Sequence, residues 1–336
     1  MRTIFVTGGA GFIGSAFVRL LLEQTDCTIV NFDLLTYAGT LENLEGVDKK
    51  RHHFIHGDIA DANAVAAALE RGTDAIVNFA AESHVDRSIA SADDFLRTNV
   101  TGTQTLLDAA RQAGVRRFVQ VSTDEVMGSL PEDDAEFFTE DSPFAPNSPY
   151  AASKAAADHL VRAYFHTYGL PTVTTNCSNN YGPYQHPEKL IPVIILNVMA
   201  RKPVPIYGDG MNVRDWLYVR DHVDALWLVL TRGRVGETYT IGGHNERSNL
   251  QLAQKICEMI DALGLGGRGD SKKLIELVAD RPGHDRRYAI DSGKIETALG
   301  WKPGHAFEPA LIETISWYEK NQHWVGQGRR AEPPAG

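Results

Sequence analysis

The sequence predicts an α/β fold in which helices cover both faces of a doubly wound parallel sheet. Two observations carry this expectation. Short apolar runs alternate with helix-like segments through the first half of the chain, and a cluster of glycines joins the first run to the first helix. The chain has 336 residues, 43% of them hydrophobic, so it is long enough to bury a substantial core.

The expected elements follow one another in a regular order. Apolar runs predict strands at residues 2–7, 27–33, 52–58, 74–82, 117–123 and 171–179. Helix-like segments lie between most of them, at residues 15–24, 62–72, 101–114 and 148–169. Strands that alternate with helices pair in parallel, so residues 1–180 predict a Rossmann domain, which can regain short segments from the C-terminal half.

The regular alternation of predicted strands and helices ends after residue 180. Gly, Pro, Tyr and His gather at two places, and mixed shorter elements follow; these segments are residues 179–189, 206–216, 237–243 and 249–264. We therefore expect a smaller α/β C-terminal domain at residues 181–325, packed at the carboxyl edge of the sheet. Two segments predict little fixed structure: a loop at residues 264–273 and a disordered tail at residues 326–336.

Charge and hydropathy exclude two classes of protein. The formal net charge is −10, whereas a nucleic-acid-binding protein is more often basic. The longest apolar stretch, residues 190–200, contains Pro and Asn and is too short to span a bilayer. The chain starts almost directly with a strand and a glycine motif, with no signal peptide visible. We expect a soluble cytoplasmic protein with no nucleic-acid or membrane partner.

Cysteine and histidine usage predicts neither disulfides nor a metal site. The three cysteines are widely spaced, which indicates buried free thiols in a reducing compartment; they are Cys27, Cys177 and Cys257. No spacing of His, Asp and Glu forms a metal motif, so a structural role is favoured for His84, His186 and His222.

A glycine motif marks the predicted cofactor site. Gly8, Gly11 and Gly14 have the spacing GxxGxxG, directly after the first strand, and a helix opens on them. Glycines let the backbone approach a pyrophosphate, and the helix N-terminus supplies N–H donors and a positive dipole. An ordinary tight turn is the alternative, but the context of strand, turn and helix favours dinucleotide binding.

Asp33, at the end of the second strand, predicts which dinucleotide binds. A carboxylate there suits the ribose hydroxyls of NAD and repels the 2′-phosphate of NADP, and neither Arg nor Lys follows within residues 34–39. The alternative is a helix or turn cap. Asp58 and Ile59 follow the third strand, where an adenine could rest, although an Asp N-cap explains that position equally well.

Tyr150 and Lys154 are the predicted catalytic pair. Their spacing of four places them one turn apart on one helix face. A neighbouring ammonium favours the phenolate, which can remove a proton from an alcohol while hydride leaves the carbon. The pattern YxxxK also occurs by chance as a surface pair, but the dinucleotide motif upstream favours catalysis.

These motifs together resemble the extended short-chain dehydrogenase/reductases, an NAD-binding family. Within it, several strings resemble the dTDP-glucose 4,6-dehydratases over essentially the whole chain except the tail. They are AAESHVDRS, STDEV, NCSNNYGPYQHPEKLIP, IYGDG, RDWLYV and RPGHDRRYAID. The resemblance implies that the substrate is a nucleotide-sugar, dTDP-glucose. It also implies oxidation at C4 with NAD⁺, loss of water across C5 and C6, and return of hydride to C6.

The segment at residues 122–126 carries the step that distinguishes such an enzyme. Eliminating water needs a base at C5 and an acid at C6; the resemblance implies Glu125 as the base and Asp124 as the acid. Burial and the Glu125 charge would raise the pKa of Asp124 and keep it protonated. Thr123 would hydrogen-bond the 4-oxygen. From spacing alone, a solvated turn or a helix N-terminus is the commoner home of such a carboxylate pair.

The resemblance also implies two sets of binding residues. The cofactor would contact residues of the glycine turn and the strand ends, namely Gly8, Gly11, Phe12, Ile13, Gly14, Asp33, Leu34, Leu35, Thr36, Asp58, Ile59, Phe79, Ala80, Ala81, Ser83, Thr98, Tyr150, Lys154 and Asn180. The nucleotide-sugar would contact Ser83, Thr123, Asn179, Lys189, Leu190, Pro205, Ile206, Tyr207, Arg214, Asn249, Asp280, Arg281, Pro282, Gly283 and His284. Lys189, Arg214 and Arg281 are suitable partners for a diphosphate.

One departure and three alternatives accompany this interpretation. Met127 stands where the family usually has Tyr, and neutral packing is the favoured explanation. A nucleotide-sugar 4-epimerase or a decarboxylase shares the glycine and Tyr motifs, and a non-catalytic dinucleotide sensor shares the fold. The resemblance also implies a homodimer joined through the helices at residues 101–114 and 148–165.

Overall fold

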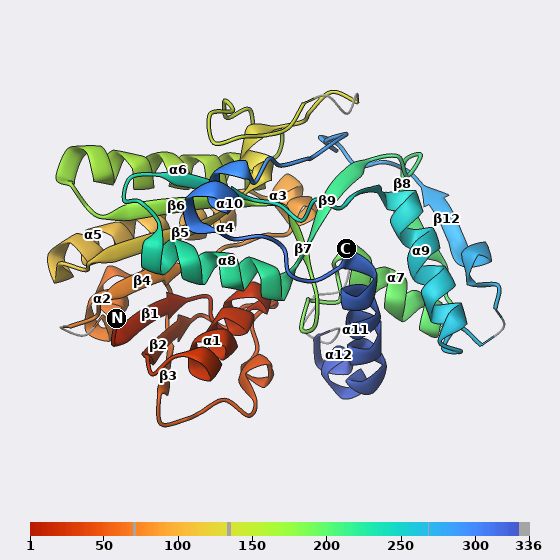
Figure 1. Ribbon diagram of the computed structural model, residues 1–336, viewed down its shortest axis with the longest axis horizontal. Helices are drawn as coiled ribbons and strands as arrows, with labels where there is room; N and C mark the ends of the chain where they lie inside the picture. The colour runs from red at the N-terminus through yellow and green to blue at the C-terminus, as the bar shows by residue number, and fades with distance from the viewer. Residues whose placement is uncertain (70–71, 133–135, 268, 329–336) are drawn as a thin grey trace.

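A seven-stranded parallel sheet organises the computed structural model, which describes residues 1–69, 72–132, 136–267 and 269–328 (Figure 1). The strand order is β10-β6-β5-β4-β1-β2-β3, and every pairing in this sheet is parallel. The strands are β1 (Thr3–Thr7), β2 (Thr28–Asp33), β3 (His52–His56), β4 (Ala75–Asn78), β5 (Arg117–Thr123), β6 (Thr172–Cys177) and β10 (Thr238–Ile241). The order reverses between β1 and β4, where doubly wound sheets open a crevice for ligands.

The sheet buries both faces because alternate side chains of each strand point to opposite sides. Ile4 and Val6 of β1 belong to a core that includes residues of α1 (Phe12–Gln24) and α8 (Val219–Arg232). Phe5, between them, belongs to a second core with residues of α5 (Thr103–Ala113) and α6 (Pro149–Tyr168). Figure 1 shows the two helix layers on opposite faces of the sheet.

The remaining helices near the sheet are short. They are η1 (Leu41–Leu44), α2 (Ala62–Ala68), α3 (Val85–Ala90), α4 (Asp93–Phe95), η2 (Leu96–Gly102), η3 (Asp124–Met127) and α10 (Gly293–Leu299). The helix expected from residue 101 therefore begins eight residues earlier, at Asp93, and passes through a π-helical segment, η2. Asn99 in that segment is buried, and its side chain hydrogen-bonds the backbone of Glu82 and the hydroxyl of Ser153. π-helical turns are frequent at functional sites.

The C-terminal half adds two small sheets and a separate apolar core. Strands β11, β9 and β7 form one sheet, and β12 pairs with β8 in the other. These elements are β7 (Asn179–Tyr181), β8 (Val204–Tyr207), β9 (Val213–Tyr218), β11 (Glu246–Ser248), β12 (Ile275–Val278), α7 (Leu190–Met199), α9 (Asn249–Ala262), η4 (Ser271–Leu274), α11 (Phe307–Lys320) and α12 (Gln322–Gly328). Apolar residues of α7, α9 and α11 fill the core, among them Ile194, Ile256 and Leu311.

β10 pairs with β6 and so adds a segment of the C-terminal half to the main sheet, in line with the expectation that the Rossmann domain can regain such segments. Two other expectations for this half need correction. The segment at residues 264–273, expected to be a flexible loop, contains the start of η4, because Ser271 is buried and hydrogen-bonds Asp261. The first residues of the expected disordered tail belong to α12, which buried Trp324 anchors by donating to Asn43 at 2.8 Å. Residues 329–336 lie outside the described residues.

The cysteine prediction is confirmed: all three are buried free thiols. Within the described part of the chain, no helix is long and apolar enough to cross a membrane.

We predict that Asp221→Ala lowers the free energy of unfolding by about 2 kcal/mol, because a buried carboxylate there joins α8 to the segment before α11. Asp221 Oδ1 accepts from Gly304 N at 3.0 Å and from His305 Nδ1 at 2.7 Å, and Oδ2 accepts from His305 N at 3.1 Å. Denaturant unfolding measures the change. The matched control is Arg220→Ala, which removes the exposed ion pair with Glu313 and should cost less than about 1 kcal/mol. Equal losses in the two variants would contradict the prediction.

Candidate active site

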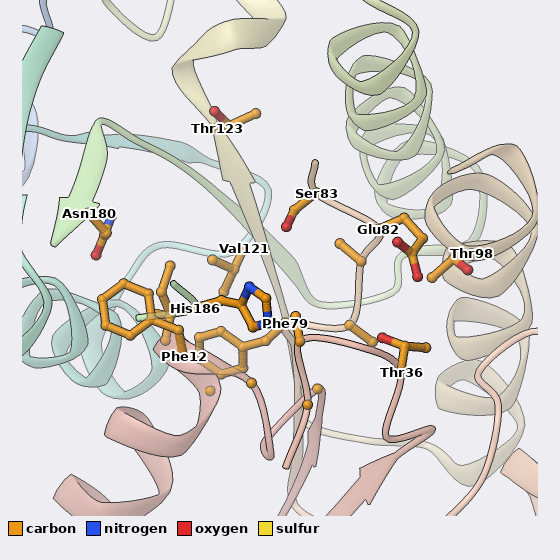
Figure 2. Close-up of a pocket in the computed structure, with 18 of the residues that line it drawn as sticks. Phe12, Thr36, Phe79, Glu82, Ser83, Thr98, Val121, Thr123, Asn180 and His186 are labelled. Atoms are coloured by element: carbon orange, nitrogen blue, oxygen red, sulfur yellow. The ribbon is translucent and has the colours of Figure 1, made fainter. Parts of the chain in front are cut away.

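A cavity of about 320 Å³ opens along the carboxyl ends of the central strands. This volume falls within the range of small-molecule sites. Figure 2 shows its lining side chains converging from different elements, including Phe12 from α1, Thr123 from β5 and Asn180 from β7. The cavity therefore lies where the fold predicts a ligand, outside the strand ends at the point of order reversal.

The glycine turn forms the wall of the cavity beside α1. A Cβ on Gly8, whose φ is +67°, would lie 2.6 Å from the backbone nitrogen of Ala80, so only glycine lets β1 and the end of β4 approach this closely. A Cβ on Gly14 would lie 2.2 Å from Gly8 O. The first turn of α1, all of it described, contains no acidic side chain and no side-chain cap. Its N–H groups are suited to an anion.

Asp33, at the end of β2, lies next to this turn. Its Oδ2 accepts from Ala10 N at 2.9 Å and its Oδ1 accepts from Leu35 N at 2.8 Å, so two backbone amides fix the carboxylate at the cavity wall. Burial raises the pKa of Asp33, and the two amide hydrogen bonds oppose that rise. The lysines that line the described cavity, Lys154 and Lys189, come from α6 and the segment before α7, not from the Asp33 turn.

Three consecutive polar residues, Thr123, Asp124 and Glu125, follow one another where β5 ends, at the other end of the cavity. Thr123 caps η3 by accepting from Glu125 N at 3.3 Å, so the chain turns as soon as the strand ends. Thr123 and Glu125 line the cavity. Asp124, between them in the chain, is buried, and its Oδ2 has no hydrogen-bond partner among the described residues. Burial raises the pKa of Asp124 well above its usual value, and the carboxylates of Glu125 and Asp215 add to the effect.

Tyr150 and Lys154 face the cavity from the first turns of α6, and both are buried. Lys154 Nζ donates to Val121 O at 2.9 Å, which ties the helix to β5. Burial lowers the pKa of Lys154, while Asp158 opposes that change. The sequence predicted that Lys154 favours a Tyr150 phenolate. In this structure burial dominates and raises the pKa of Tyr150 well above 10, followed by the Glu125 charge, with a hydrogen bond to Thr123 opposing.

Nearly all predicted cofactor residues line this cavity, with Leu35 as the exception. Leu35 packs against the sheet core and contributes its backbone N–H to Asp33. Of the predicted substrate residues, Ser83, Thr123, Asn179 and Lys189 line the cavity. The others do not; they are Leu190, Pro205, Ile206, Tyr207, Arg214, Asn249, Asp280, Arg281, Pro282, Gly283 and His284.

The three predicted diphosphate cations nevertheless converge on one side chain. Burial raises the pKa of Glu125, and Arg214, Arg281 and Lys189 each lower it, in that order of effect. Arg214 donates to Asp285 O at 2.9 Å, and its guanidinium lies 4.2 Å from the ring centroid of Tyr288. The C-terminal half thus brings positive charge to the carboxylate that β5 delivers, which the net charge of −10 does not suggest.

Sequence reasoning missed several lining residues. They are Phe32, Ala38, Gly39, Gly57, Val121, Ser122, Cys177, Ser178, Gln185, His186 and Glu188. Most adjoin a predicted residue in the chain, so the ends of the predicted strands were the available signal. Asn179 Oδ1 and Gln185 Oε1 are buried acceptors that have no partner within the described chain. They suit a ligand with hydrogen-bond donors.

Met127 lies outside the cavity. It is buried in a small apolar cluster that includes Leu130, Phe138, Ala155 and Tyr288. The side chain therefore fills core volume, as an unbranched thioether does readily.

The histidines considered as possible metal ligands have other contacts. His84 caps α3 and lies 3.4 Å from Glu188 Oε2. His222 Nδ1 lies 2.9 Å from Asn180 Oδ1, and the ring of His186 lies edge-on to that of Tyr37. Within the described residues, no group of His, Cys, Asp and Glu is arranged to hold a metal ion.

Known proteins resemble this chain over nearly its full length. The family model for GDP-mannose 4,6 dehydratase matches residues 5–314. The dTDP-glucose 4,6-dehydratase of Neisseria meningitidis is 53% identical, and the match covers 96% of this chain and 95% of that protein. The crystal structure of a Streptomyces venezuelae dTDP-glucose 4,6-dehydratase with NAD bound superposes with a TM-score of 0.90 at 52% identity, covering 96% of this chain and 98% of that one. A Thermus thermophilus UDP-glucose 4-epimerase complex with NAD has a TM-score of 0.85 at 30% identity, covering 95% and 100%.

We predict that Asp124→Asn makes the protein more stable at neutral pH. The raised pKa means that Asp124 keeps its proton in the folded state but releases it on unfolding above about pH 4. Its contribution to stability is therefore complete below that pH and is lost as the pH rises, whereas Asn has no proton to lose. Thermal unfolding at several pH values should show a gap between variant and wild type that closes toward pH 4. A gap independent of pH would contradict the assignment.

Proposed function

The chain belongs to the dTDP-glucose 4,6-dehydratases, NAD-dependent lyases, and on that premise we propose how its residues carry out the conversion of dTDP-glucose to dTDP-4-keto-6-deoxyglucose and water. The observation that carries the proposal is the placement of Asp124 and Glu125 directly after β5, beside Tyr150. Elimination of water needs an acid and a base together, and this segment supplies two carboxyl groups whose surroundings separate their pKa values.

The cavity residues fit NAD. The glycine turn and the N-terminus of α1 suit a pyrophosphate, and the amide-fixed carboxylate of Asp33 suits ribose hydroxyls and disfavours a 2′-phosphate. NAD⁺, when bound, accepts a hydride from C4 of the sugar and returns it to C6, and its positive ring favours the phenolate of Tyr150. Asp58, which pairs with Arg97 at 2.5 Å, and Ile59 would adjoin the adenine.

Tyr150 would begin the reaction. Its phenolate oxygen removes the proton of the sugar 4-hydroxyl, and the Thr123 hydroxyl holds the 4-oxygen. Because burial and the nearby carboxylates raise the pKa of Tyr150, the phenolate needs a positive charge nearby. Lys154, one helical turn away, supplies one.

Glu125 and Asp124 would perform the elimination. Burial raises the pKa of Glu125, and the Arg214, Arg281 and Lys189 charges oppose that rise, so they favour the ionised form that takes the C5 proton. Asp124 is shielded from water and adjoins the Glu125 charge, so it holds a proton that it can give to the C6 hydroxyl as water leaves. Three nearby cations thus favour the ionised form of Glu125, whereas burial and the Glu125 and Asp215 charges favour the protonated form of Asp124.

The same three cations would hold the substrate diphosphate. Lys189 donates to Ser83 O at 3.1 Å, and Arg281 lies 3.2 Å from Asp86 on α3. Charge-assisted contacts to phosphate oxygens are strong and directional. We therefore assign residues 181–325 as the part of the chain that binds the nucleotide-sugar.

Two alternative functions are less well supported. An epimerase needs neither of the two carboxyl groups, and the Thermus thermophilus epimerase is 30% identical to this chain, against 52% for the Streptomyces venezuelae dehydratase. A non-catalytic sensor does not need Tyr150 and Lys154, which are both retained and both face the cavity.

We also propose a cytoplasmic homodimer joined through α5 and α6. The outer side of these helices exposes short and polar residues, including Gln104, Ala152 and His159. Small side chains let two helices pack closely.

We predict that the wild-type protein converts dTDP-glucose, without added NADH, to a base-labile 4-keto product that absorbs near-ultraviolet light. Tyr150→Phe should lower kcat about 100-fold or more, because the base is lost. The matched control is Tyr164→Phe on the same helix, whose hydroxyl contacts Asp108 and which should keep full activity. Formation of only the galactose epimer would overturn the function, and full activity of Tyr150→Phe would overturn the role of that residue.

We predict that Asp124→Asn slows loss of water about 100-fold while C4 oxidation changes much less, because only elimination uses the acid. Transient NADH absorbance follows oxidation, and deuterium exchange at C5 follows the Glu125 step. Met127→Leu is the control: it fills the same core volume outside the cavity and should leave both rates unchanged. Equal loss of the two steps in Asp124→Asn would count against the assignment.

A further inference from the structure

Helix α6 carries a third buried ionisable residue in line with the catalytic pair. Tyr150, Lys154 and Asp158 follow one another at intervals of four, which places them on one face of the helix. All three are buried, with Asp158 only 4% exposed. The reaction as described above uses the first two and leaves the carboxylate unexplained.

Lys154 needs a counter-charge. Its side chain is 4% exposed, and Val121 O is a neutral partner for its Nζ, at 2.9 Å. A buried ammonium with no opposite charge nearby loses its proton readily. Asp158 has the largest effect that raises the pKa of Lys154 against burial.

Asp158 is also connected to the segment that carries the acid and the base. Its Oδ2 accepts from Asn176 Nδ2 at 3.1 Å, and the same amide nitrogen donates to Thr123 O at 3.1 Å. Asn176 lies on β6 and Thr123 ends β5, so one amide bridges the helix and both strands. The carboxylate therefore orients the amide that holds the peptide between Thr123 and Asp124.

We propose that Asp158 is a positioning residue that keeps Lys154 in its ammonium form and, through Asn176, holds the Thr123 carbonyl, so that it sets the base strength of Tyr150. This inference rests on the proposed role of Tyr150. Asp158 does not touch substrate; it acts through the two residues it contacts or faces.

The surroundings of Asp158 agree with this role. The groups that act on its carboxyl are Lys154 on its own helix, Ser122 on β5 and Asn176 on β6; burial raises its pKa to about 6 and these three lower it. Cys177, on the neighbouring strand, has its pKa raised to about 12 and stays neutral at pH 7. In addition to burial, the charges of Glu125 and Asp124 on η3 raise the pKa of Tyr150. Asp158 is therefore mostly ionised at neutral pH and balances the Lys154 charge.

The test is Asp158→Asn, which keeps the volume and removes the charge. Lys154 then loses its proton more readily and the Tyr150 pKa rises. The rate of C4 oxidation rises with pH as Tyr150 loses its proton. In Asp158→Asn this rising limb of the pH profile should move to higher pH by about one unit, so that the rate at pH values below it falls about tenfold. The KM for dTDP-glucose should stay unchanged. In protein without substrate, acylation of Lys154 at pH 7, followed by peptide mass spectrometry, should become about tenfold faster, because more of the amine is neutral.

The matched control is Asp108→Asn, which removes a carboxylate that contacts the same helix through Tyr164, away from Lys154. It should shift neither the pH limb nor the Lys154 reactivity. A rate that falls equally at all pH values in Asp158→Asn, or unchanged Lys154 acylation, would overturn the inference.

If Asp158→Asn fails to fold, Asn176→Ser is the second variant, because it removes one donor to the carboxylate. It should move the same limb of the pH profile in the same direction, and an unmoved limb would again overturn the inference. A wild-type protein that forms no keto product would instead overturn the proposed function.

Discussion

The position of β5 between β4 and β6 is the constraint on which the rest of the site depends. The strand is buried on both faces, and its last three residues, Val121, Ser122 and Thr123, line the cavity. There the chain turns at once into η3 and places Glu125 in the cavity. Because α6 packs on the same strand and anchors Lys154 to Val121 O, the reacting groups of two elements share one rigid support.

Burial makes this arrangement costly and also useful. It raises the pKa values of Asp124 and Tyr150 and lowers that of Lys154, so each group is pushed toward its neutral form. Charges from elsewhere in the fold counter these shifts where the chemistry needs an ion. Arg214 and Arg281 act on Glu125 from the C-terminal half, and Asp158 acts on Lys154 from within α6. The active site therefore depends on both halves of the chain, although its scaffold belongs mainly to the first.

Particular residues show how far the sequence could be interpreted. Gly8 and Gly14 were recognisable because strand, glycine turn and helix are contiguous in the chain, and the structure gives each a close backbone contact. Thr98 lines the cavity from a π-helical segment that periodicity placed outside the expected helix. Strand β10 is a C-terminal segment that joins the main sheet, and the sequence could not indicate which segment would do so, because a short apolar run shows no preference for one sheet over another.

The sequence by itself determined the fold class and the glycine turn, because these depend on local spacing and on neighbours in the chain, whereas the roles of Asp124 and Glu125 came from the resemblance to a known family. Tertiary structure alone decided which groups carry charge and which face the cavity. Asp124 and Glu125 are adjacent in sequence, yet one is enclosed and the other faces three cations from distant segments. Protonation depends on burial and on charges that approach through space, and neither can be read from the order of residues.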